Sequence, residues 1–192
     1  MIRTTIQGID LVFETSEGLF SPQAVDRGTL AMLSQVEFQP SDKVLDLGCG
    51  YGVVGILAAK LIGPDKVFMI DNDPAAVDCA RLNAGLNGVP QVAVSLSDGF
   101  RDFAESHFTR ILCNPPYHED FSVAKHFVHK GFNRLVLGGQ MWMVTKRPKW
   151  YANKLRAIFG EAERRRTSGY HVFLATKTSF TWAKAERKRS EE

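Results

Sequence analysis

Residues 111 to 118, which read Ile-Leu-Cys-Asn-Pro-Pro-Tyr-His, hold the side chains best suited to chemistry in this chain. Asn114 follows a short apolar run and precedes two prolines, which remove two amide donors and fix the turn. The side-chain oxygen of Asn114 and the backbone carbonyl of Pro115 could together accept both hydrogens of an amide or aniline-like NH₂ group. Such acceptors would orient a weakly nucleophilic nitrogen and stabilise the charge that builds on it. A rigid exit from a strand is the alternative that these residues leave open.

The residues after Pro115 extend this candidate site. Tyr117 offers a flat ring on which a planar base or amide could stack. His118 could line the pocket for the acceptor, or it could be a loop histidine that bonds to the backbone. We therefore expect an acceptor pocket bounded by Pro116, Tyr117 and His118, with the chemistry carried by Asn114, Pro115 and Tyr117.

A glycine-rich turn follows another apolar run, in residues 44 to 52, Val-Leu-Asp-Leu-Gly-Cys-Gly-Tyr-Gly. Gly48 and Gly50 lack the Cβ atoms that would keep a ligand away from the backbone. Such a turn alone is a weak signal of a nucleotide-binding loop. Asp46, just before the turn, would repel a pyrophosphate and attract a cationic group. We therefore expect the turn to bind a ligand that carries positive charge.

Two further aspartates follow the next two predicted strands. Asp71 ends the first of them, where a carboxylate can accept hydrogen bonds from both hydroxyls of a ribose. Asp73, in the same segment, is suited to cap a helix that begins at Pro74. Asp98 follows the second strand in Ser-Asp-Gly-Phe. Each acid alone could simply cap a helix or form a turn. Three acids after three successive strands, beside a glycine turn, favour a binding site.

Strands and helices alternate around these motifs, which predicts a Rossmann-like, doubly wound, mostly parallel seven-stranded α/β sheet. In such a sheet ligands bind at the carboxyl ends of the strands, where every motif above lies. We expect one domain over residues 1–182, made of an N-terminal hairpin and helix in 1–36 and a core in 43–178, and a basic tail in 183–192. The predicted core strands are 43–47, 66–70, 92–96, 110–113, 135–144, 163–168 and 170–177, and the predicted helices are 22–36, 53–62, 74–86, 121–133 and 150–159.

Composition indicates an ordinary globular protein, with 192 residues of which 44% are hydrophobic and 23% charged. A chain of this length can bury a core without disulfides or metals. The cysteines at 49, 79 and 113 fit no zinc-ligand spacing, so we expect a reducing compartment and no metal. The N-terminus has no long apolar region, and no run approaches the ~20 apolar residues that span a bilayer. These features predict a cytoplasmic protein without a membrane partner.

Positive charge is clustered in the C-terminal half, although the net charge is only +3. A solvated surface is one explanation of such clusters. A surface that contacts the phosphates of RNA is the other. The clusters are Lys146, Arg147 and Lys149; Arg164, Arg165 and Arg166; and Lys184, Arg187, Lys188 and Arg189.

The glycine turn resembles motif I of class I S-adenosylmethionine-dependent methyltransferases, in which an acidic residue precedes Gly-x-Gly-x-Gly. Residues 114 to 117 are similar to the Asn-Pro-Pro-Tyr type motif of the amino methyltransferases in that class. The resemblance implies that the turn surrounds the methionine part of S-adenosylmethionine, whose ammonium and sulfonium are positive. It also implies that Asp71 binds the ribose and that Asp98 accepts a hydrogen bond from the adenine amino group.

Two N-terminal segments, Gly-Leu-Phe-Ser in 18–21 and Asp-Arg-Gly-Thr-Leu in 26–30, resemble the opening of the "methyltransferase small" domain. That family includes rRNA guanine-N2 methyltransferases, whose motif is often Asn-Pro-Pro-Phe-His, and the resemblance covers roughly residues 10–178. It implies methylation of an exocyclic base amine in RNA, guanine N2 of rRNA, with rRNA or a ribosomal particle as partner. The implied cofactor residues are Phe20, Asp46, Gly48, Gly50, Asp71, Asn72, Asp98 and Asn114, and the implied substrate residues are Pro116, Tyr117, His118, Lys146 and Arg147.

Three other functions are compatible with these motifs to different degrees. A protein-glutamine N5-methyltransferase uses Asn-Pro-Pro-Tyr on a side-chain amide, although as a rule it lacks the following histidine. A DNA adenine methyltransferase fits less well because the sequence shows no target-recognition domain. A scaffold that binds S-adenosylmethionine or RNA without catalysis is the non-enzymatic alternative, and the intact motif at residues 114 to 117 argues against it.

Overall fold

The computed structural model describes residues 1–115 and 121–183. Its centre is a seven-stranded sheet in the order β5-β4-β3-β6-β7-β9-β8, and the pairs among β5, β4, β3, β6 and β7 are all parallel. The chain starts this sheet in the middle, builds outward through β4 and β5, and returns to place β6 beside β3. The switch between β3 and β6 is the place where doubly wound sheets bind ligands. The strands are β3 (Val44–Leu47), β4 (Val67–Asp71), β5 (Ala93–Leu96), β6 (Phe108–Cys113), β7 (Leu135–Thr145), β8 (Glu163–Thr167) and β9 (Tyr170–Thr176).

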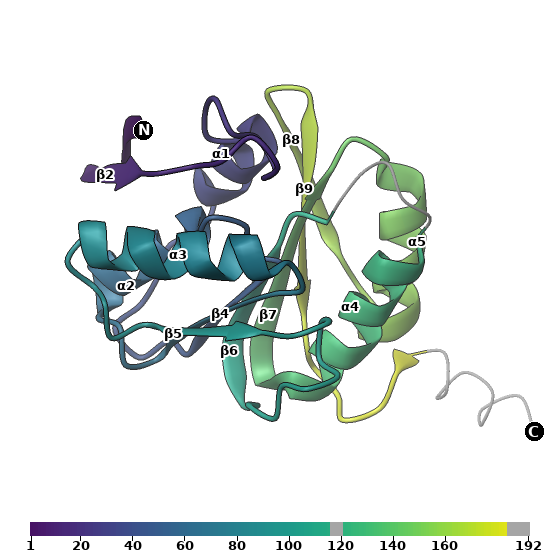
Figure 1. The fold of residues 1–192 in the computed structure, drawn as a ribbon. Helices are drawn as coiled ribbons and strands as arrows, with labels where there is room; N and C mark the ends of the chain where they lie inside the picture. Colours follow the sequence, from purple (N-terminus) through teal and green to yellow (C-terminus); the bar gives the residue numbers. More distant parts are fainter. Residues whose placement is uncertain (116–120, 184–192) are drawn as a thin grey trace, which may run out of the picture.

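Helices cover both faces of the sheet, as the alternating pattern predicts (Figure 1). One face carries α1 (Arg27–Leu33), α2 (Val53–Ile62) and α3 (Pro74–Leu86), and the other carries α4 (Ser122–Arg134) and α5 (Pro148–Phe159). Successive strand residues point to opposite faces. Val44 packs in the core under α1 to α3, for example, while Leu45 packs in the core under α4 and α5. The Rossmann-like fold is therefore confirmed.

The N-terminal hairpin is also confirmed, as β1 (Ile2–Ile6) paired with β2 (Ile9–Phe13). Two asparagines attach it to the core: Asn83 in α3 and Asn87, the C-cap of that helix. The side chain of Asn87 bonds both the backbone N–H and the carbonyl of Val12, at 3.1 and 2.7 Å, and the side-chain oxygen of Asn83 accepts from the backbone N–H of Glu14 at 2.7 Å. These paired amides replace the strand partner that β2 lacks on that side.

Helix α1 differs from the prediction, which placed a helix over 22–36 with its start at Ser21-Pro22. The helix begins at Arg27 because the carboxylate of Asp26 caps it, accepting from the backbone N–H of Thr29 at 2.8 Å. Ser21 has a positive φ of 54°, and its hydroxyl donates to the carbonyl of Ala24 in a separate turn. The apolar spacing of 22–36 therefore spans a turn and a short helix.

Helix α2 packs closely against β4 because Gly55, within the helix, and Gly52, its N-cap, have no side chain. A Cβ atom on Gly55 would lie 2.3 Å from Cγ of Met69 in β4, and one on Gly52 would lie 3.4 Å from Sδ of the same methionine. Gly52 also has a φ of 98°, which glycine adopts without strain. The glycines of the turn thus let the helix start directly above the strand ends. In the two described stretches of the chain, no helix is both long and apolar enough to cross a bilayer.

Candidate active site

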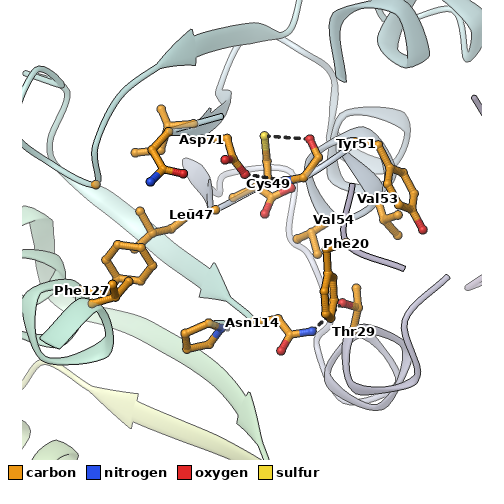
Figure 2. A pocket seen from close by; sticks show the side chains of 18 of the residues that line it. Phe20, Thr29, Leu47, Cys49, Tyr51, Val53, Val54, Asp71, Asn114 and Phe127 are labelled. Atoms are coloured by element: carbon orange, nitrogen blue, oxygen red, sulfur yellow. Dashed lines mark hydrogen bonds between the residues drawn. The ribbon is translucent and has the colours of Figure 1, made fainter. Parts of the chain in front are cut away.

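A cavity of about 260 Å³ opens at the carboxyl ends of β3, β4 and β6 (Figure 2). We call it the central cavity. Its walls come from the N-terminal segment, the glycine turn, the ends of the strands and helix α4, which are far apart in the sequence. The lining residues are Phe20, Asp26, Thr29, Asp46, Leu47, Gly48, Cys49, Gly50, Tyr51, Val53, Val54, Ile70, Asp71, Asn72, Ser97, Asp98, Gly99, Asn114, Pro115, Val123 and Phe127.

Asp46 lies at the base of the central cavity and is only 3% exposed. Its carboxylate accepts one hydrogen bond, 2.8 Å long, from the backbone N–H of Gly55 in α2. Burial raises the pKa of Asp46 to about 7; the bond from Gly55 lowers it and the nearby charge of Asp71 raises it. A single hydrogen bond offsets little of the cost of burying a charged carboxylate. A cation placed beside the carboxylate would stabilise its charged form. The expectation that this position favours a cationic group fits that environment.

Asp71 is held by the backbone on both carboxylate oxygens. One oxygen accepts from the N–H of Gly50 at 2.8 Å, and the other accepts from the N–H of Asp73 at 3.0 Å. These bonds fix the carboxylate at the wall of the central cavity, where two hydroxyls of a ribose could reach it. Asp73 itself caps α3 through the N–H of Ala75, as predicted.

Asp98 and Asn72 lie farther out on the same wall, and both are exposed. The carboxylate of Asp98 forms an ion pair of 3.1 Å with Arg101. Ser97 next to it is buried, and its hydroxyl donates to the carbonyl of Gly99 at 2.8 Å, which fixes the loop after β5. The loop therefore presents polar edges that could accept from or donate to a planar ligand.

Asn114 reaches the central cavity from the end of β6, next to Pro115, which is buried. The side-chain nitrogen of Asn114 donates to the carboxylate of Asp26 at 2.7 Å and to the hydroxyl of Thr29 at 3.1 Å. Sequence reasoning missed these two partners, although they belong to the 26–30 segment that it singled out. Pro116, Tyr117 and His118 lie outside the described residues.

Apolar side chains complete the central cavity, and sequence reasoning found one of them. Phe20, 53% exposed, lies over the cavity next to Thr29 and Asn114 (Figure 2). Phe127 and Val123 enter from α4. Phe127 lies close to Gly48, since a Cβ there would be 4.0 Å from its ring. No local motif marks these α4 residues, because their spacing is that of any buried helix face.

Lys146 and Arg147 follow β7 at the same edge of the sheet but do not line the central cavity. Arg147 lies 4.4 Å from the ring centre of Phe121, and Phe121 stacks on Trp150 with ring centres 4.4 Å apart. Lys146 lies over the ring of Tyr170 at 4.9 Å. A separate depression, which we call the basic groove, is lined by Phe121, Arg147, Pro148, Lys149, Trp150 and Asn153.

Among the described residues, no group of three or more His, Cys, Asp or Glu side chains is placed to hold a metal ion. The side chains that surround the central cavity combine fixed carboxylates, exposed backbone at glycines, an aromatic ring and an oriented amide. This set could hold a nucleoside with an attached cationic chain and present an amide to a second, planar ligand.

Comparison with known proteins identifies the family. The model of the methyltransferase small domain matches residues 10–174. The ribosomal RNA large subunit methyltransferase G of Aeromonas hydrophila is 32% identical over 165 residues, which are 82% of this chain and 43% of that protein. The ribosomal RNA small subunit methyltransferase C of Pseudomonas entomophila is 31% identical over 83% of this chain and 49% of its own length.

A solved structure has the same fold. The Thermus thermophilus 16S rRNA N2 G1207 methyltransferase, in complex with AdoMet and guanosine, has a TM-score of 0.83 and 28% identity, covering 91% of this chain and 49% of that one. The chain therefore spans about half the length of these three relatives. The family match covers most of the chain, and the chain belongs to the methyltransferase small domain family.

Proposed function

We propose that this protein is an S-adenosylmethionine-dependent methyltransferase that methylates an exocyclic amine of a base in RNA. The observation that carries the proposal is the position of Asn114 at the rim of the central cavity, with its amide nitrogen bonded to Asp26 and Thr29. This arrangement presents an oriented amide to an acceptor at the mouth of a cavity whose carboxylates suit a cationic nucleoside.

The lining of the central cavity supports S-adenosylmethionine as the cofactor, with the following roles for its residues. Asp71, fixed by two backbone N–H groups, would accept the ribose hydroxyls. Asp46 would face the cationic methionine part, whose charge offsets the cost of a buried carboxylate. Bound there, the cofactor supplies an electrophilic methyl group. The remaining contacts that we assign to it are made by Phe20, Gly48, Gly50, Asn72, Asp98 and Asn114.

Asn114 and Pro115 would act on the acceptor. The side-chain oxygen of Asn114 and the backbone carbonyl of Pro115 would accept both hydrogens of the amine, which holds its nitrogen in line with the methyl group. The same two oxygens stabilise the positive charge that develops on the nitrogen. No strong base is required, since the proton can leave to water after the transfer. Tyr117 would stack on the base, with Pro116 and His118 beside it.

RNA is the acceptor that the surroundings favour. The basic groove combines two cations, Arg147 and Lys149, with the stacked rings of Phe121 and Trp150. Cations that contact phosphates and aromatic rings that stack on bases are the usual means of binding single-stranded RNA. The relatives named above are rRNA methyltransferases, and one of them was solved with guanosine. We therefore propose guanine N2 of rRNA as the target.

Comparison of modified nucleosides tests this proposal. RNA from a strain that lacks the gene is digested and analysed by mass spectrometry, beside RNA from the parent and from strains complemented with the wild type or with Asn114→Ala. We expect one methylated base, N2-methylguanosine, to decrease in the deletion and to return only with the wild type. If every methylated base persists and a methylated glutamine disappears from protein instead, the acceptor is a protein.

A further inference from the structure

The N-terminal segment contacts the candidate catalytic amide directly. One oxygen of Asp26, Oδ2, accepts two hydrogen bonds: from the backbone N–H of Thr29 at 2.8 Å, which caps α1, and from Nδ2 of Asn114 at 2.7 Å. The hydroxyl of Thr29 accepts a third, from the same Nδ2 at 3.1 Å. Asp26 and Asn114 are 88 positions apart in the chain, so tertiary packing alone joins them.

These bonds determine which way the amide of Asn114 points. An amide NH₂ group has two hydrogens, and Asp26 and Thr29 are two acceptors for them. A flipped amide would place its oxygen against the carboxylate of Asp26, where both groups are acceptors and repel. The carbonyl oxygen of Asn114 must therefore point away from Asp26, and Figure 2 shows the side-chain nitrogen on the side of Thr29.

The charge of Asp26 adds to this geometric effect. A hydrogen bond to a carboxylate is stronger than one to a neutral acceptor. Hydrogen bonds in series also polarise one another. Donation to Asp26 shifts electron density of the Asn114 amide toward its oxygen, and this oxygen then accepts more strongly from an amine that gains positive charge.

The segment is also tied to the cofactor side of the cavity. The hydroxyl of Tyr51, in the glycine turn, lies 3.4 Å from the carbonyl oxygens of Ser21 and of Ala24. Thr29 is only 9% exposed, and both Asp26 and Thr29 line the central cavity. The contact between α1 and the end of β6 is therefore part of a packed wall.

We propose that Asp26 and Thr29 are positioning residues that orient and polarise Asn114 for the transfer of the methyl group. The proposal rests on the role given above to Asn114. It explains why the aspartate and the threonine of the 26–30 segment stand three positions apart at the start of a helix: the same carboxylate caps the helix and anchors the amide.

Four variants test the two residues. Asp26→Asn can keep one oxygen within reach of both donors but removes the charge, whereas Asp26→Ala removes the acceptor. We expect kcat to fall roughly tenfold in the first and up to about 100-fold in the second, the range of a hydrogen bond to a charged group. Thr29→Val should lower kcat by several-fold, by roughly the loss of one neutral hydrogen bond, and Thr29→Ser should restore it. The KM for the cofactor should stay within about twofold in all four.

Asp42→Asn is the matched control for Asp26→Asn. One oxygen of Asp42 likewise accepts from a backbone N–H, that of Gln39 at 2.7 Å, and from a side chain, Nε of Arg110 at 2.6 Å, but Asp42 does not line the central cavity. The control removes the charge of a doubly bonded aspartate without touching Asn114. We expect it to lower thermal stability at least as much as Asp26→Asn and to leave kcat unchanged.

A readout that needs no acceptor separates this proposal from the proposed function. The side-chain NH₂ resonances of Asn114, assigned in ¹⁵N-labelled protein by comparison with Asn114→Ala, should shift in Asp26→Asn and Thr29→Val and stay in place in Asp42→Asn. Unchanged resonances, or a loss confined to cofactor affinity with kcat intact, would overturn the positioning role. If the wild type modifies protein rather than RNA, the RNA proposal fails, and the same kcat ratios on the protein acceptor still decide the role of Asp26 and Thr29.

Discussion

The central cavity and the basic groove lie at the same edge of one sheet and carry opposite charges. Of the described residues that line the central cavity, four are aspartates and none is Lys, Arg or His. The described lining of the basic groove contains Arg147 and Lys149 and no acid. Strands β3, β6 and β7 are neighbours in the sheet. Asp46 lies near the end of β3, Asn114 follows β6, and Arg147 follows β7.

This difference in charge would direct a cationic cofactor and a polyanionic acceptor to separate places at the same edge of the sheet. Carboxylates at the end of β3 favour a cationic cofactor and repel phosphates, while the cations after β7 do the reverse. The amide of Asn114, which follows β6 between the two regions, is neutral, and its nitrogen bonds to the carboxylate of Asp26 on the cavity side. Each of the following predictions concerns a change in one of these regions and asks whether the function of the other region is left intact.

Asn114→Ala should have the largest effect because it acts where the two regions meet. We expect kcat to fall by about 10²–10³-fold, the loss seen when one group that stabilises a transition-state charge is removed. Binding of S-adenosylhomocysteine, measured by calorimetry on the same variant, should be nearly unchanged. A variant that keeps most of its kcat on the true acceptor would exclude the proposed role of the amide.

Asp71→Ala should damage only the cavity side. Loss of a charge-assisted contact predicts cofactor binding weaker by roughly 1.5–3 kcal/mol, with RNA affinity unaffected. Asp78→Ala is the control for the change in net charge, since Asp78 is exposed on α3 and, among the described residues, its carboxylate pairs only with Arg81. Equal cofactor affinity in the two variants, measured by calorimetry, would remove Asp71 from the ribose site.

Reversal of Lys146 and Arg147 to Glu should damage only the groove side. We expect RNA binding to weaken on the order of 50-fold in about 50 mM salt, because fewer phosphate contacts release counterions. The slope of log K against log salt should decrease as well. Lys60→Glu with Lys66→Glu is the matched control, since both lysines are exposed and flank the opposite end of β4. A filter-binding titration in which both double variants lose affinity equally would show that only net charge matters.

The buried carboxylate of Asp46 predicts a pH dependence on the cavity side. Its pKa is raised to about 7, so below that pH the ligand-free protein holds a proton there. A cationic cofactor favours the charged form, and binding must then release the proton. We expect affinity for S-adenosylmethionine to fall by up to about tenfold from pH 8 to pH 6 and to level off above pH 8.

Two measurements check the Asp46 prediction. Calorimetry in buffers of different ionisation enthalpy should detect proton release near pH 6, and Asp46→Asn should abolish it. Without ligand the sign is opposite: the unfolded chain loses the proton first, so the free energy of unfolding should decrease as pH rises from about 4 to 7. Cofactor affinity that is flat across this range would place the cation away from Asp46.

Local sequence patterns were sufficient to predict most helices and strands and the residues on the cavity side of the site. Asp46, Gly48, Gly50, Asp71, Asp98 and Asn114 all line the central cavity, as expected. The reason is local: alternating strands and helices specify a doubly wound sheet, and the ends of its parallel strands converge at one edge. A place at the end of β3, β4, β5 or β6 was therefore enough to predict a place in the cavity lining, whereas Lys146 and Arg147, which follow β7, lie outside it.

Contacts between side chains that are far apart in the sequence became known only from the folded structure. Phe127 of α4 reaches the glycine turn, and Asp26 bonds to Asn114. Phe121 stacks on Trp150 and also contacts the guanidinium of Arg147. The start of α1 at Arg27 belongs here too, since the cap at Asp26 outweighed the apolar spacing that favoured an earlier start. Periodicity and turn residues specify the local path of the chain, whereas such contacts depend on how far and at what angle separate elements pack, which no short stretch of sequence encodes.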